Sequence, residues 1–290
     1  MIKTVKSLRL LSLLTVLGAS PASALYCASP VPDDTRLAAV TRIVSTSLSS
    51  SKLLTQEETT YQGGRPLESV TSLSGASMPA TTWAATWHYA ADGQLSTLDT
   101  VAGFGSSKPV PSQEKYEYDA QGRVSRVLFR ERGNREFVTL ATCSYRPGTV
   151  TEHETGAQGY QPRTFEYTLD GTGQVTRYSQ TIQGNEGDTN VTTIIREGGR
   201  VVRAEQHVVS SMYGSQITVT DYNADGMPVA SVSHTYESEQ DAVGELTMAF
   251  KMEYLLDTRG NWTQKLEYVS EGGPWELSTR ETRTITYTAP

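Results

Sequence analysis

Stretches in which apolar and polar residues alternate are separated by short polar, glycine-rich segments, and this pattern runs along most of the chain. The clearest unit is YEYDAQGRVSRV at residues 116–127, with tyrosines on alternate positions before Asp119 and Gly122. Strict alternation is typical of a β-strand with one buried face, and the i, i+3, i+4, i+7 spacing of a helix is weak after the first residues. The pattern therefore predicts strands joined by tight turns.

The turns recur at a regular interval. Glycines stand at positions 64, 93, 122, 148, 173, 199, 226 and 260, which are 25 to 34 residues apart. A period of this size indicates a repeat architecture. In the segment DAQG, the aspartate suits the first position of a type I turn and the glycine suits the left-handed position that follows, a common hairpin connection. We expect eight hairpins, and hence roughly sixteen strands.

Counting back four and forward two from each glycine gives the expected cross-strand neighbours. They are Tyr89 with Leu95, Tyr118 with Val124, Leu169 with Val175, Ile195 with Val201, Tyr222 with Pro228, Leu256 with Trp262, Thr60 with Pro66, and Ser144 with Val150. Five of the first six pairs join an aromatic or aliphatic residue to an apolar residue other than proline, the kind of contact that stabilises a sheet, whereas the pairs of Thr60 and Ser144 fit worse. The apolar pairs place Tyr89, Tyr118 and Ile195 on an apolar face, and they leave Glu117 and Glu166 on a face suited to water.

The expected fold is all-β. It is an antiparallel meander of about eight hairpin repeats that forms a large curled sheet or a barrel-like shell, because open sheets rarely exceed about ten strands without curling. Residues 56–290 form this single domain. Residues 25–55 form a lead-in segment, in which 35–51 suits a short helix or a strand equally well.

Residues 1–24 read as a secretory signal peptide. A basic start is followed by an apolar run of about ten residues and by Ala22-Ser23-Ala24, a small-x-small cleavage pattern. The run is too short to span a membrane, and the mature chain has no candidate transmembrane helix. A lipid anchor at Cys27 is the alternative, although Tyr26 is larger than such a site prefers. We expect an exported protein in the periplasm, at the cell surface or secreted.

The charge of the chain bears on its partners. Removal of the first 24 residues leaves 22 basic against 32 acidic side chains, a net charge of −10. Nucleic-acid binding depends on clustered lysine and arginine, so the sequence predicts no nucleic-acid partner. In an exported protein, Cys27 and Cys143 can form a disulfide or remain two free thiols. The four histidines, at 88, 153, 207 and 234, lack metal-ligand spacing, and no metal or cofactor is expected.

Catalytic patterns are weak. Ser49–Lys52 matches S-x-x-K in a serine-rich segment, without the other motifs of that enzyme class. His153 stands beside Glu154, but no nucleophile is placed near them. Glu117, Glu166 and Glu253 precede turns and could line up on adjacent hairpins, where a wet sheet face would leave them solvated. The sequence predicts a protein that is not an enzyme.

The segment YEYDAQGRV resembles the YD repeat, Y-x-Y-D-x-x-G-R, of Rhs and teneurin-type surface proteins. The segments WHYAADGQL, FEYTLDGTGQV and DYNADGMPV are weaker copies, and the likeness covers most of residues 60–262. In that family the repeats form spiralling β-sheet shells at the cell surface, some of which enclose a toxin domain. The resemblance implies a hairpin-built shell. The spacing here is longer than the family's, and no toxin or protease core follows.

Aromatic side chains are the best candidates for ligand contacts. Trp83, Trp87, Tyr89, Tyr116 and Tyr118 combine flat apolar rings with polar tips, as in many interfaces. The alternative is that they only build the apolar face of the sheet. We expect an exported, non-catalytic β-repeat protein whose curled sheet acts as a binding or structural surface for a protein, glycan or lipid of the cell envelope. An outer-membrane β-barrel and an exported glycan-active hydrolase are the alternative functions.

Overall fold

The computed structural model describes residues 26–27, 37–50, 52–75, 78–105, 107–131, 133–156, 161–210, 214–236 and 245–288. These residues contain eighteen β-strands and no helix. The strands are β1 (Val40–Ser49), β2 (Leu54–Gln62), β3 (Arg65–Gly75), β4 (Met78–Tyr89), β5 (Leu95–Phe104), β6 (Val110–Tyr118), β7 (Val124–Glu131), β8 (Val138–Arg146), β9 (Thr149–Glu154), β10 (Arg163–Leu169), β11 (Val175–Ile182), β12 (Asn185–Glu197), β13 (Arg200–Ser210), β14 (Gly214–Tyr222), β15 (Pro228–Tyr236), β16 (Glu245–Leu256), β17 (Trp262–Ser270) and β18 (Glu276–Tyr287). The expected signal peptide lies outside the described residues.

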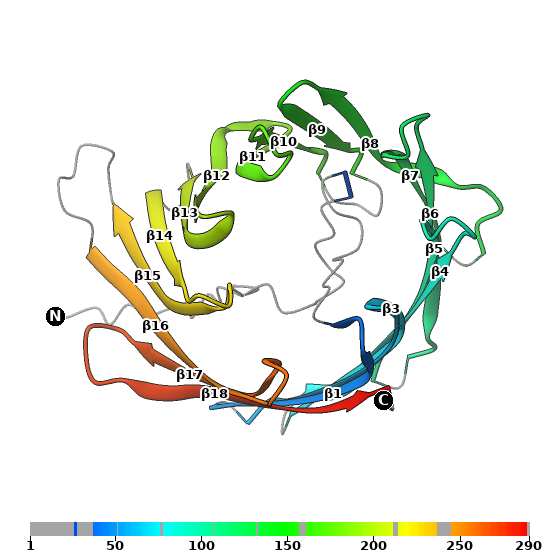
Figure 1. The fold of residues 1–290 in the computed structure, drawn as a ribbon. Coiled ribbons are helices and arrows are strands. Elements are labelled where there is room, and N and C mark those ends of the chain that lie inside the picture. Colours follow the sequence, from blue (N-terminus) through cyan, green and yellow to red (C-terminus); the bar gives the residue numbers. More distant parts are fainter. Residues whose placement is uncertain are drawn as a thin grey trace, which may run out of the picture.

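The strands follow one another around a closed antiparallel barrel. Each strand pairs with the next in the chain, and β1 pairs with both β2 and β18, so the meander closes on itself (Figure 1). The all-β meander expected from the sequence is confirmed, and its form is the closed one. Sixteen strands belong to the eight expected hairpins. The other two, β1 and β18, seal the ring, and β1 lies in the segment for which helix and strand were equally suitable.

Four of the turns use an aspartate or asparagine in the same way. The side chain of Asp119 accepts hydrogen bonds from the main-chain N–H groups of Gln121 and Arg123, both at 2.9 Å. Asp170, Asn223 and Asp257 make the same pair of bonds in their own turns. The glycine of each turn has a positive φ, which is 76° at Gly122. This is the conformation expected for a type I turn followed by a left-handed glycine.

The hairpins at glycines 64, 148 and 199 differ from that template. Their loops contain two residues, because Gln62 pairs with Arg65, Arg146 with Thr149, and Glu197 with Arg200. The expected pairs Thr60–Pro66, Ser144–Val150 and Ile195–Val201 are therefore wrong by one residue, and Tyr61, Tyr145 and Arg196 take the first positions. The slip has a consequence for Ile195. It pairs with Arg203 and is 38% exposed rather than on the apolar face.

The two faces of the sheet can be assigned from the described residues Tyr26 and Cys27. Figure 1 shows this short dark blue segment inside the ring, beside β8. Cys27 forms a disulfide with Cys143 of β8, so the Cys143 side chain points inward. Side chains alternate along a strand, and register carries the assignment to the neighbouring strands. We call the two surfaces the inner wall and the outer wall.

The outer wall is polar. Ion pairs connect neighbouring strands there, among them Arg42–Glu58 at 2.7 Å, Arg126–Glu117 at 2.6 Å and Arg203–Asp221 at 2.8 Å. Apolar side chains also lie on this wall: Val70 and Val101 are exposed and pair with Ala84 of the strand between them. Glu117 and Glu166 lie on this wall, as the alternation predicted.

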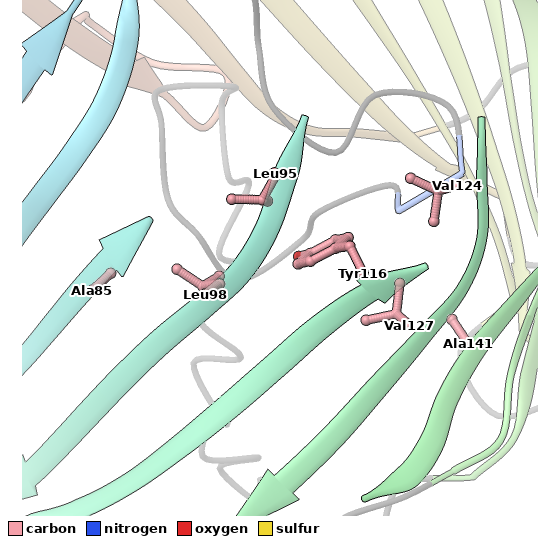
Figure 2. Close-up of a cluster of buried hydrophobic side chains, with 7 residues drawn as sticks. All are labelled: Ala85, Leu95, Leu98, Tyr116, Val124, Val127 and Ala141. Carbon is pink, nitrogen blue, oxygen red and sulfur yellow. The ribbon is translucent and has the colours of Figure 1, made fainter. Parts of the chain in front are cut away.

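The inner wall carries the buried apolar residues. One cluster consists of Ala85, Leu95, Leu98, Tyr116, Val124, Val127 and Ala141, which come from β4 to β8 and lie on the same face of the sheet (Figure 2). A second cluster on β9 and β10 contains Val150, Phe165 and Tyr167 together with Cys27. Across the ring the inner wall is more polar, with hydroxyl pairs such as Thr218–Ser233 at 2.8 Å. No helix in the described ranges is long and apolar enough to cross a membrane.

Candidate functional site

The inner wall at β6 to β10 binds a short piece of polypeptide, the Tyr26–Cys27 segment, which lies in a turn. The disulfide to Cys143 joins residues 116 positions apart in the sequence, with the two Cα atoms 5.6 Å apart. The Tyr145 hydroxyl lies 3.1 Å from the main-chain oxygen of Cys27 and 2.8 Å from that of Val124, and its single hydrogen is shared between these two acceptors. The segment is therefore held by the Cys27 side chain through the disulfide and by its backbone through hydrogen bonds, and only the hydrogen bonds are independent of its side chains.

Glu152 of β9 provides the matching acceptor for this backbone. Its Oε2 atom accepts a 3.0 Å hydrogen bond from the Cys27 N–H, and the carboxylate also accepts one from the Tyr26 N–H. The residue is 0% exposed. Burial raises the pKa of Glu152 to about 7, and the nearby charge of Glu154 acts in the same direction. The Oε1 atom has no hydrogen-bond partner among the described residues.

The Tyr26 side chain reaches a second glutamate. Its hydroxyl donates to Oε1 of Glu114 at 3.3 Å, and the Tyr116 hydroxyl donates to Oε2 of the same carboxylate at 2.8 Å. The two rings are tilted with centroids 6.3 Å apart. Burial is the main reason that the pKa values of Tyr26, Tyr116 and Glu114 are all raised. The hydroxyl groups of two tyrosines thus meet at one buried carboxylate on the inner wall.

Glu154 completes an acidic cluster, which we define as Glu114, Glu152 and Glu154. Arg163 of β10 forms an ion pair with Glu154 at 3.0 Å, while burial still raises the pKa of Glu154. Tyr167 lies beside the cluster and donates to Glu152 Oε2 at 3.4 Å. The charge of Glu154 acts on both other carboxylates and contributes to the raised pKa values of Glu114 and Glu152.

The aromatic residues predicted as ligand contacts all project from the inner wall. Trp87, Tyr89 and Tyr118 pack against the cluster that contains Tyr116, whereas Trp83 stands apart from that cluster with 36% of its surface exposed. The structure therefore brings four of the five together. Tyr116 is only 5% exposed, with Tyr26 packed against its ring.

The residues weighed for catalysis are not brought together. His153 and Glu154 alternate along β9, so His153 lies on the outer wall, 2.9 Å from the Thr164 hydroxyl, and Glu154 lies on the inner wall. The Ser49 hydroxyl accepts a hydrogen bond from the Leu53 N–H. On the outer wall Glu117 pairs with Arg126 and Glu253 with Lys251, an arrangement that lowers the pKa of both carboxylates through these hydrogen bonds.

A second polar region lies on the inner wall at β2, β17 and β18. Glu281 is bridged by Lys265 at 3.3 Å and by Arg283 at 3.5 Å. The Arg283 guanidinium lies 3.4 Å from the centre of the Trp262 ring, and burial lowers its pKa. Among the described residues, two cations pair with one carboxylate here, whereas Arg163 pairs with one of the three carboxylates of the acidic cluster.

The acidic cluster was missed in the sequence, although a signal existed. In β6, Glu114 has the same alternation as Tyr116, and in β9, Glu152 has the same alternation as Val150. A charged residue on the apolar face of a strand is a candidate site, because its burial is costly without a partner. In the part of the chain that the structure describes, no group of three or more His, Cys, Asp or Glu residues is arranged to bind a metal ion.

No protein-family model matches the chain, and no curated protein matches it. Among solved structures, a porin-like protein from Bacteroides uniformis is similar to it, with a TM-score of 0.45 and 12% identity over 85% of this chain and 98% of that one. The Tc holotoxin pore of Photorhabdus luminescens matches 81% of this chain and 14% of its own, with a TM-score of 0.27 and 13% identity. A TcdB2-TccC3-Cdc42 structure matches 81% of this chain and 16% of its own, with a TM-score of 0.26 and 9% identity. Scores this low carry no argument about function.

Proposed function

We propose that this protein is an exported, non-catalytic β-shell whose inner wall is a binding surface for polypeptide. The observation that carries the proposal is the bound Tyr26–Cys27 segment. Its main-chain N–H groups are taken by Glu152 and its main-chain oxygen by Tyr145, and its aromatic side chain lies against Tyr116. A wall that recognises backbone and an aromatic ring in its own chain has the chemistry to recognise them in a partner.

The polar outer wall supports a shell surrounded by water. A lipid-facing barrel needs a continuous apolar band, and charged residues near the middle of such a band cost about 2–4 kcal/mol each. Here Glu117, Arg126 and Lys115 lie on adjacent strands of the outer wall. Arg203 and Asp221 make a similar pair elsewhere in the ring.

An outer-membrane barrel is the second candidate function. The closed antiparallel meander with an even number of strands favours it, since bacterial barrels of this kind have that topology. Phase separation in a cloud-point detergent distinguishes the two. A shell surrounded by water stays in the aqueous phase after release from the cell, whereas partition into the detergent phase would replace the first candidate with the second.

Photo-crosslinking from the two walls tests the binding surface. A photoreactive amino acid is placed at Trp83 on the inner wall or at Val70 on the outer wall of the adjacent strand, two exposed positions. In cells that export the protein, adducts with polypeptide are expected from position 83 and not from position 70. Adducts from position 70 alone, or adducts that contain only glycan or lipid, would contradict the proposal.

The likeness of residues 116–123 to the YD repeat supports placing this chain among shells built from such repeats. We propose a distant relationship on that basis. The closed barrel and its hairpin repeat are consistent with it, and the two-residue turns at glycines 64, 148 and 199 are departures from the repeat.

A further inference from the structure

The side chain of Tyr26 makes two kinds of contact on the inner wall. Its ring packs against the apolar cluster of Figure 2 and is tilted against the Tyr116 ring, with the two centroids 6.3 Å apart. Its hydroxyl donates to Oε1 of Glu114 at 3.3 Å. The wall thus offers one side chain both apolar contacts and a hydrogen-bond acceptor, a combination that suits the flat ring and polar tip of a tyrosine. We call Glu114 and this cluster the tyrosyl site.

Glu114 makes the site selective for the hydroxyl. Its other oxygen, Oε2, accepts a 2.8 Å hydrogen bond from Tyr116. Burial is the main cause of its raised pKa, followed by the two tyrosine hydroxyls and Glu154, none of which is a cation. An aromatic side chain without a hydroxyl would leave Oε1 without the donor that Tyr26 provides, and a buried acceptor without a donor is costly. The site should therefore prefer tyrosine to phenylalanine.

The residue after the tyrosine is bound through its backbone. The Cys27 N–H donates to Glu152 at 3.0 Å, and the main-chain oxygen of Cys27 lies 3.1 Å from the Tyr145 hydroxyl. Every residue except proline has both of these backbone groups. Together with the tyrosyl site, these contacts fit a tyrosine followed by any residue that has an N–H group, whichever chain supplies the two residues.

The disulfide holds the chain's own tyrosine at this site, because it joins the next residue, Cys27, to Cys143 of β8. A ligand that is part of the same molecule has a high effective concentration, so a second chain competes poorly with it. Exchange with a dithiol breaks the S–S bond, converts the dithiol to a disulfide and leaves thiols on Cys27 and Cys143. Tyr26 would then lack its covalent attachment to the wall, and a partner could compete for the site.

We propose that the tyrosyl site recognises a tyrosine of the polypeptide partner, and that the chain's own Tyr26–Cys27 segment, latched by the disulfide, is a competing occupant that closes the site. The inference rests on the proposed function, in which the inner wall binds polypeptide. The oxidised protein is the closed form. A dithiol that reduces the latch gives the open form.

Peptide binding to the full-length exported chain tests the site. The probe is the peptide acetyl-Gly-Tyr-Ser-Gly-amide, compared with peptides that have phenylalanine or lysine in place of the tyrosine. Tyr26→Ala keeps the disulfide and opens the tyrosyl site alone, whereas Cys27→Ser removes the latch and frees the backbone contacts as well. In calorimetric titrations, both variants should bind the tyrosine peptide at least about tenfold more tightly than the oxidised parent does.

The three peptides and a matched pair of glutamate variants test the selectivity. Tyr26→Ala should bind the tyrosine peptide about tenfold more tightly than the phenylalanine peptide, the effect of one hydrogen bond to a carboxylate. Adding Glu114→Leu should remove this preference, because leucine has no acceptor. Adding Glu166→Leu on the outer wall instead is the control, and the preference should remain.

The outcomes separate this inference from the proposed function. Equal affinity of Tyr26→Ala for the three peptides, or tightest binding of the lysine peptide, overturns the tyrosine selectivity. Equal binding of the tyrosine peptide to the oxidised parent and to Cys27→Ser overturns the latch. If Tyr26→Ala fails to fold, the peptides are compared in Cys27→Ser, where loss of the preference contradicts the proposal. In each of these cases, polypeptide adducts from position 83 would leave the proposed function standing.

Discussion

The Tyr118 hydroxyl donates a 2.7 Å hydrogen bond to the main-chain oxygen of Leu95, the first residue of the second strand in the preceding hairpin. The same connection recurs around the ring. Tyr89 bonds to Pro66, Tyr145 to Val124 and Tyr254 to Pro228, all at 2.8–2.9 Å. In these four hairpins, the tyrosine before the turn thus joins the hairpin to the one before it. The second tyrosine of the Y-x-Y-D pattern therefore has a structural role in the shell.

Tyr118→Phe should destabilise the shell without changing its fold. The substitution removes the donor and keeps the ring, so the free energy of unfolding should fall by about 1 kcal/mol. Denaturant unfolding measures the change. Tyr268→Phe is the control, because that hydroxyl lies on the outer wall and makes a 3.5 Å contact with exposed Glu253. An equal loss for both variants would contradict the role of the connection between hairpins.

Two glycines of one turn should respond differently to alanine. Gly173 has a φ of +83°, whereas Gly171 does not have a left-handed φ, and neither has an atom that would contact an added Cβ. Gly173→Ala should therefore cost about 1 kcal/mol through backbone strain alone. Gly171→Ala should change the free energy of unfolding by less than about half of that. A similar loss at both positions would show that the turn geometry assigned here is wrong.

The raised pKa of Glu152 should make stability depend on pH. In the folded chain the pKa is about 7, against an ordinary value of 4.5, so the folded state retains a proton that the unfolded state releases. Stability should fall as pH rises from about 4.5 to about 7 and then level off. A carboxylate that is stabilised by an ion pair would give the opposite trend, with stability rising as pH rises.

Glu152→Gln should remove this fall, and Glu166→Gln should not. The measurement is the Tm as a function of pH in a chain with a blocked amino terminus, so that no α-ammonium group contributes. The full effect of the shift is on the order of 3 kcal/mol. Stability that rises with pH through this window would contradict the burial of an uncompensated carboxyl group.

Loss of the disulfide should destabilise the fold strongly, because the bond closes a loop with a sequence separation of 116. The chain-entropy model gives a loss of about 4–5 kcal/mol for a loop of this length. Cys27→Ser, Cys143→Ser and the double variant should unfold at the same lowered temperature. A double variant that is no less stable than the parent would show that the bond does not restrain the folded chain.

The hairpins could be predicted from sequence because their signals are local. Asp119 and Gly122 stand at fixed positions in a turn, and the strands on either side alternate within a few residues. The register failed where a two-residue loop replaced the longer one, as at Gly198–Gly199, and Ile195 then moved to the outer wall. Closure of the ring depends on β1 and β18, which are more than 200 residues apart, and no local pattern carries that pairing.

The candidate site could be predicted only in part. The aromatic residues Tyr116 and Tyr118 were visible as an apolar face, and both lie on the inner wall. The docking of Tyr26 against Glu114, 88 residues away, is a tertiary contact between a short turn segment and the barrel. Its sequence signal was the placement of a glutamate among apolar positions, which has meaning only when the face is known to be buried.

The closed form of the shell depends on the pairing of β1 with β18. Nitroxide labels on cysteines introduced at Thr46 and Thr282, which are register partners across this seam, give the most direct test. Labels at Thr46 and Gln56 of the adjacent β2 are the reference pair, since that pairing is local. A closed barrel predicts strong dipolar broadening for both pairs. Broadening for Thr46 with Gln56 and none for Thr46 with Thr282 would show an open sheet and contradict the closed shell.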